Sequence, residues 1–183
     1  MKKSFRILAL TCLTLILIFT GISFAVGPTL PSVTFEGVSY FLAWRDISDE
    51  GNITVEYLKP GETLENWTTL IGVRQWPSVE SLSDIVPPYL EERKPLFVAR
   101  SEIYFPEDRK NDIVIEMFLG APHLPYVEYN LHRFVMEEGT PGVKAYQFAQ
   151  RIPLTEDLDL SETQKHLETR LNQLKAFKVT LLR

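Results

Sequence analysis

Polar side chains at alternate positions of three expected strands could meet on one face of a sheet. Residues that are two apart in a strand point to the same side. The set comprises Arg100, Glu102, Glu116, Glu128, Asn130 and His132. A carboxylate and an imidazole near each other can exchange protons with a substrate. The patch therefore fits an acid/base site or a polar ligand cleft.

The same patch has a simpler interpretation, which we favour. An antiparallel sheet with helices on one face leaves its other face in water, and cross-strand Arg–Glu pairs are common there. On this interpretation Glu128, Asn130 and His132 are hydrated surface residues. The pKa of His132 would then stay near its ordinary value of about 6.5.

Three tryptophans are a second group of candidates, for binding rather than catalysis. Trp44, Trp67 and Trp76 lie close together in the sequence, among several tyrosines. Trp and Tyr are enriched at interfaces and binding grooves. The interpretation that we favour is that they fill the core, with the indole N–H finding a partner. Trp67, flanked by Asn66 and Thr68, is the one that we expect to be exposed.

Motifs for other chemistries are absent from the sequence. His123, His132 and His166 have no second ligand at the spacing of a zinc site. The chain contains no Gly-x-Ser-x-Gly, no Walker loop and no Gly-x-Gly-x-x-Gly. The sequence thus predicts no metal and no cofactor, and it favours a protein without catalysis. A triad built from dispersed residues stays open as an alternative.

The first 25 residues predict export. Lys2, Lys3 and Arg6 precede an apolar run that ends in small residues at Ala25, the pattern of a signal peptide cut after Ala25. An uncleaved N-terminal membrane anchor is the alternative, because the apolar run approaches the length of a bilayer span. Cleavage would give a periplasmic or secreted domain without stable membrane insertion.

The composition narrows the class of partner. The chain has 19 basic and 24 acidic residues and a net charge of −5. Cleavage after Ala25 would remove three basic residues and Cys12, the one cysteine, which leaves a more acidic chain without a disulfide. Nucleic acids and anionic membranes attract basic surfaces. We therefore expect a protein partner or a small ligand, and no nucleic acid.

The order of expected elements predicts one α+β domain over residues 33–183, after a flexible lead-in at 26–32. Strands are expected at 33–45, 53–58, 96–105, 112–119, 126–136 and 143–152. Helices are expected from residue 63, from residue 78 to the Pro87-Pro88 pair, and at the C-terminus. The last begins at the capping box Ser161-x-x-Gln164 and buries a stripe of Leu167, Leu171 and Leu174.

Separate runs of strands and helices are typical of a mainly antiparallel sheet, here of about six strands, with helices packed on one face. By element order, this layout is similar to that of PsbP-like domains and other single-sheet α+β folds. We interpret the chain as an exported accessory domain that binds a protein or a small ligand. The alternative is a hydrolase-type enzyme that uses the carboxylate and histidine face of the sheet.

Overall fold

The computed structural model describes residues 31–104, 111–155 and 165–179, with the backbone alone for residues 99–102 and 104. The predicted signal peptide, all but the end of the predicted lead-in, and the Ser161–Gln164 capping box lie outside the described residues. No helix within the described ranges is long and apolar enough to cross a membrane.

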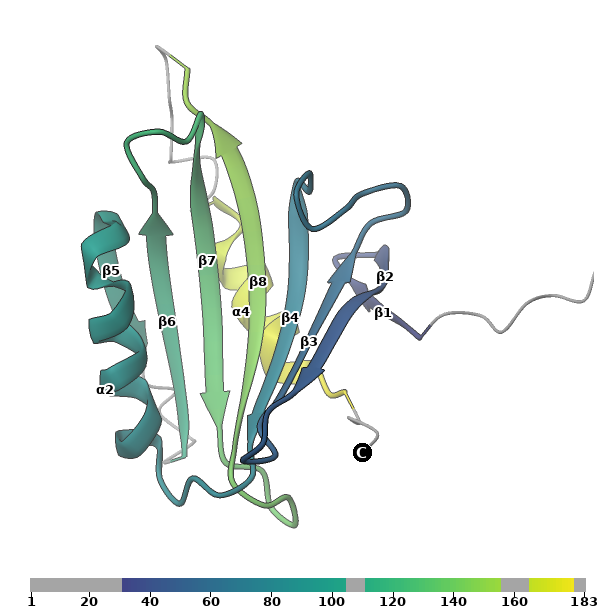
Figure 1. The fold of residues 1–183 in the computed structure, drawn as a ribbon, viewed down its shortest axis with the longest axis vertical. Coiled ribbons are helices and arrows are strands. Elements are labelled where there is room, and N and C mark those ends of the chain that lie inside the picture. Colours follow the sequence, from purple (N-terminus) through teal and green to yellow (C-terminus); the bar gives the residue numbers. More distant parts are fainter. Residues whose placement is uncertain (1–30, 105–110, 156–164, 180–183) are drawn as a thin grey trace, which may run out of the picture. The chain divides into compact units, whose positions relative to one another are not determined.

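Eight strands form one antiparallel sheet in the order β1-β2-β3-β4-β8-β7-β6-β5 (Figure 1). The bounds are β1 Ser32–Phe35, β2 Val38–Ile47, β3 Ile53–Leu58, β4 Thr69–Trp76, β5 Phe97–Tyr104, β6 Asp112–Leu119, β7 Tyr126–Val135 and β8 Val143–Pro153. The first four strands and the last four each form a meander, and the two meanders meet where β4 pairs with β8. The prediction of an α+β fold with a mainly antiparallel sheet is confirmed, but the strand count is eight rather than six.

The two additional strands have separate causes. The segment expected as one strand over residues 33–45 turns back on itself at Glu36 and Gly37, which have φ values of 50° and 73°. The apolar spacing from residue 63 predicts a helix as far as Ile71, with residues 73–76 as a candidate extended segment, but the whole of residues 69–76 forms β4. This strand pairs with β3 on one side and β8 on the other and is largely buried. Its apolar residues therefore follow no simple alternation.

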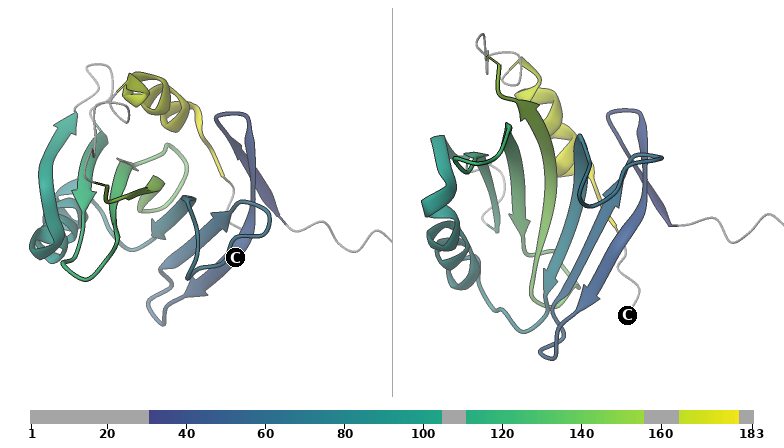
Figure 2. Two further views of the ribbon diagram at one scale, coloured as in Figure 1. Left: turned by 90° about the horizontal axis from the view of Figure 1, so that it is seen from above. Right: turned by 45° about the horizontal axis from the view of Figure 1, so that its top comes forward.

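The two α-helices in the described ranges pack on opposite faces of the sheet, so the prediction of helices on one face is wrong. Helix α4, Leu167–Ala176, packs on a face that we call the α4-side face, and α2, Leu82–Arg93, packs on the α2-side face. The sheet is curved, with α4 inside the curve and α2 outside it (Figure 2). A short 3-10 helix, Lys94–Leu96, connects α2 to β5.

Helix α2 continues through both of its prolines, whereas the sequence predicts that it stops or kinks there. Pro87 and Pro88 each remove one backbone donor, which leaves the carbonyls of Ser83 and Asp84 without helical partners. All four residues are exposed, so water can reach this side of the helix. The opposite side buries Leu82, Val86 and Tyr89 against β6, β7 and β8.

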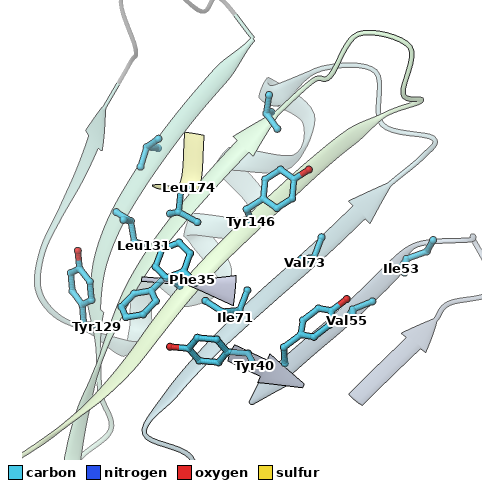
Figure 3. Close-up of a cluster of buried hydrophobic side chains, with 14 of the residues drawn as sticks. Phe35, Tyr40, Ile53, Val55, Ile71, Val73, Tyr129, Leu131, Tyr146 and Leu174 are labelled. Carbon is cyan, nitrogen blue, oxygen red and sulfur yellow. The ribbon is translucent and has the colours of Figure 1, made fainter. Parts of the chain in front are cut away.

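The main core lies between the sheet and α4 (Figure 3). Strands from both meanders contribute to it, with Phe35, Ile71, Tyr129, Leu131 and Tyr146 among the buried side chains. Leu174 of α4 is completely buried, whereas Leu167 and Leu171 are partly buried against the same core. The predicted apolar stripe on the C-terminal helix is confirmed.

Candidate functional site

The polar set predicted to share one face is divided between the two faces. Residues directly opposite each other on neighbouring strands point to the same side. His132 pairs with Gln147 on the α2-side face, and Glu128 and Asn130 share that face. Glu116 is opposite Leu131, a residue of the α4-side core, so the predicted patch does not form.

The two predicted residues on β5 are described by their backbone alone. The backbone register places Glu102 opposite Glu116. Arg100 lies in the irregular pairing between Ala99 and Glu102. The side chains of Arg100 and Glu102 are not among those described.

The expectation that this face is hydrated is wrong for Asn130 and His132, each of which is 1% exposed. Helix α2 covers the imidazole, and the hydroxyl oxygen of Tyr89 lies 3.0 Å from Nε2 of His132. Burial holds the pKa of His132 well below its ordinary value, and the positive charges of Arg74 and Arg93 lower it further. The imidazole is therefore neutral and enclosed.

A chain of hydrogen bonds crosses the α2-side face from β3 to β7. Arg74 donates through Nη2 to Oε1 of Glu56 at 3.4 Å and through Nη1 to Oε1 of Gln147. Gln147 donates through Nε2 to Oδ1 of Asn130 at 2.8 Å. Asn130 in turn donates to the backbone carbonyl of Glu128 at 3.3 Å. These contacts fix the guanidinium of Arg74 from two sides.

Gly72 leaves room for this network on β4. A Cβ atom at Gly72 would lie 2.7 Å from Oε1 of Gln147 and 3.1 Å from Nη1 of Arg74. The missing side chain therefore lets both groups cross the strand and meet.

Glu56 is the carboxylate of this network and has a shifted pKa. Burial raises its pKa, the charge of Arg74 lowers it, and the charge of Glu128 raises it, with a raised value as the result. Glu56 therefore takes up a proton more readily than an ordinary carboxylate.

A groove of about 460 Å³ lies beside α2, and the hydrogen-bond network reaches it through Arg74. Arg74 and Trp76 of β4 line one side of it. Tyr89 and Arg93 of α2 line the other, with the Arg93 guanidinium 3.6 Å from the centre of the Tyr89 ring. The groove thus places two guanidinium groups beside aromatic surface, and Glu92, which also lines it, pairs with Arg93 at 2.7 Å.

All three tryptophans lie on the α2-side face, in different environments. Trp44 is 40% exposed and pairs across strands with Glu56. Trp76 lines the groove and stacks on Phe134 at a ring distance of 6.2 Å. Trp67 is buried, with the Arg151 guanidinium 4.0 Å above its ring. The exposed tryptophan is therefore Trp44, and the expectation that Trp67 is exposed is wrong.

Glu56, Arg74 and Arg93 are not among the residues that the sequence predicts for a site. The predicted helix reaches Ile71, and residues 73–76 are predicted only as a separate extended segment, so the alternation of side-chain direction along the whole of β4 was missed. That alternation was the available signal. Arg93 joins the groove only through the packing of α2, for which no signal was available.

Metal binding has no support in the described part of the chain, where no group of three or more His, Cys, Asp or Glu side chains could hold an ion. No curated protein and no solved structure matches the chain. One protein-family model matches residues 29–179, a range that contains all eight strands and both helices. Because this match covers most of the chain, the protein belongs to the family that the model defines.

Proposed function

We propose that the protein is an exported, non-catalytic binding domain whose ligand site is the groove beside α2. The position of Arg74 is the observation that carries this proposal. Glu56 and Gln147 hold its guanidinium in place, and the same side chain lines the groove next to Trp76. A cation held in one orientation loses little freedom when a ligand binds, which favours affinity.

The lining of the groove suggests the class of ligand. Trp76, Ile85 and Pro88 offer apolar surface, and Arg74 and Arg93 are planar cations, of which Arg93 is paired with Glu92. Guanidinium groups match carboxylates in geometry and charge. We propose a ligand that carries an apolar or aromatic group beside a carboxylate, supplied by a partner protein or a small molecule. Trp44, on the strand beside Glu56, would extend the contact surface for a larger partner.

The arrangement supports binding more than hydrolysis. A general base must come within hydrogen-bonding distance of the proton that it takes from the substrate. His132 is enclosed beneath Tyr89, and neither His132 nor Glu128 is among the residues that line the groove. The role that these contacts support for His132 is to position α2 over the sheet.

Nuclear magnetic resonance titration with hydrocinnamate tests the proposal, because this probe joins a phenyl ring to a carboxylate. We expect shifts at the Trp76 indole and at the backbone of α2, and weaker shifts with 3-phenylpropanol, which lacks the charge. Arg74→Gln should weaken binding of hydrocinnamate. Arg45→Gln removes the same charge from β2 and should leave binding unchanged. Equal binding by both variants, or no shifts in the groove, would refute the proposed site.

Export rests on the pattern of residues 1–25 and has its own test. Intact mass and N-terminal sequencing of the protein expressed with its full sequence should show a chain that begins at Val26. A product that retains Met1 in the membrane fraction would instead establish the anchor alternative.

A further inference from the structure

A second cavity, of about 860 Å³, lies where the β7–β8 turn meets the C-terminal end of α4. Seven charged side chains line it, four of them cationic: Arg133, Lys144, Lys175 and Lys178. This location is separate from the groove beside α2, which shares no lining residue with it.

Arg133 and Asp112 build the inner wall of the cavity. They are 3% and 1% exposed, and two hydrogen bonds of 2.9 Å join them, from Nε to Oδ1 and from Nη2 to Oδ2. Nη1 of Arg133 donates to the backbone carbonyls of Leu174 and Lys175 at the end of α4. Arg133 is thus occupied within the protein and anchors the helix that carries Lys175.

A second set of contacts balances the negative charge of the Glu137 carboxylate. Nζ of Lys144 donates to its Oε2 and the hydroxyl of Tyr146 donates to its Oε1, each at 2.8 Å. Burial raises the pKa of Glu137, but these hydrogen bonds lower it below the ordinary value. Lys144 is 8% exposed, so this pair is also part of the built wall.

Lys175 and Lys178 are the cations that remain. Neither forms an ion pair or a side-chain hydrogen bond with any residue in the described ranges. The third acid of the cavity, Glu138, is exposed. With four cations and three carboxylates, the cavity has a positive surplus although the chain has a net charge of −5.

We propose that this cavity binds a small soluble molecule carrying a doubly charged oxyanion, such as a phosphate monoester, with Lys175 and Lys178 as its main contacts. Two ammonium groups match the two charges of such a group, and lysine binds phosphate well as a point charge. The volume lies within the range of small-molecule sites and leaves room for the remainder of the ligand. The inference is independent of the groove beside α2.

Isothermal titration with inorganic phosphate and with glycerol phosphate tests the proposal. Both should bind, with affinity that falls as sodium chloride screens the charges. The double variant Lys175→Gln/Lys178→Gln should lose at least about tenfold in affinity, because charge-assisted contacts are the strong ones. Lys175 lies in the last turn of α4 and Lys178 follows the helix, and neither is buried, so thermal unfolding should confirm that this variant is folded.

The control is Lys94→Gln, which removes an exposed lysine outside the cavity and should bind both probes like the parent. Three outcomes would overturn the proposal: no binding of either probe at millimolar concentration, equal binding by the double variant and the parent, or binding only to vesicles that contain phosphatidic acid. The last would assign the oxyanion to a lipid headgroup rather than to a soluble ligand.

Discussion

The hydroxyl oxygen of Tyr89 on α2 lies 3.0 Å from Nε2 of His132 on β7, and the two side chains are 7% and 1% exposed. This contact is the polar connection between α2 and the sheet beneath it. It places a titratable ring where protonation would bury an additional positive charge close to Arg74 and Arg93. The stability of the fold should therefore depend on the protonation of His132.

We predict that His132 makes the protein less stable as the pH falls below about 6.5. Because its folded pKa is lowered, the unfolded chain binds a proton between pH 6.5 and the folded pKa that the folded chain does not bind. The free energy of unfolding should fall by about 1.4 kcal/mol per pH unit in this range, with no contribution from His132 above it. Urea unfolding at about pH 7.5 and 5.5 measures the change, which His132→Gln should lack.

Two comparisons isolate this effect. Glu56 acts in the opposite direction, because its raised pKa adds stability as the pH falls, but it is present in both proteins and cancels in their difference. Tyr89→Phe keeps the buried imidazole, so it should keep the pH dependence while losing about 1 kcal/mol at neutral pH. An identical pH dependence in the parent and in His132→Gln would contradict the prediction.

The ion pair of Asp112 with Arg133 should be among the most sensitive sites to mutation. Asp112→Ala would leave the guanidinium buried without its counter-charge, which costs about 3–5 kcal/mol of unfolding free energy. Lys94→Ala is the control, because the Lys94 and Glu91 side chains are 67% and 73% exposed. This control should change stability by less than about 0.5 kcal/mol. A loss below 1 kcal/mol for Asp112→Ala would show that water reaches the pair.

Gly139 and Gly142 offer a matched test of close packing in the β7–β8 turn. Their φ values are nearly equal, at 74° and 75°, so alanine should cost about 1–2 kcal/mol at either position through backbone strain. A Cβ at Gly142 would also lie 1.9 Å from the carbonyl oxygen of Trp76, whereas Gly139 has open space. Gly142→Ala should therefore cost about 1–3 kcal/mol more than Gly139→Ala in chemical denaturation. Equal losses would mean that the turn moves away from β4.

Substitutions in the leucine stripe of α4 should lower the free energy of unfolding in proportion to the burial of each leucine. Leu174→Ala removes a completely buried side chain and should cost about 2–5 kcal/mol, as cavity-forming substitutions do. Leu171 is only partly buried, so its replacement by alanine should cost less. Thermal unfolding of the two variants provides the comparison. A larger loss at Leu171 would place the helix in a different rotation on the sheet.

Alternation along single strands was predictable, and pairing between strands was not. Glu128, Asn130 and His132 do share a face, because side-chain direction within a strand has a period of two. The face that Glu116 joins depends on the register between β6 and β7, which opposes Glu116 to Leu131 and Met117 to Asn130. A shift of one residue exchanges the two faces, and the connecting segment that sets this register has no diagnostic turn motif.

The other errors arose from burial on both sides of the sheet. If every helix covered the same face, as predicted, His132 would meet water. In the structure α2 packs on the opposite face from α4 and encloses His132. Arg74 lines the groove beside α2. The sequence therefore predicted which polar side chains of one strand share a face. It did not predict whether that face meets water, because this depends on where a distant helix packs.

The antiparallel pairing of β4 with β8 brings residues 69–76 against residues 143–150, so the centre of the sheet joins segments that are far apart in the chain. During synthesis β8 is the last of the eight strands to emerge, and until then β4 and β7 each have an open edge. Such an edge can pair with another unfinished chain, and distant pairings form slowly. Thr69–Trp76 and Tyr126–Val135 are thus the segments through which unfinished chains could mispair before β8 joins the two halves of the sheet.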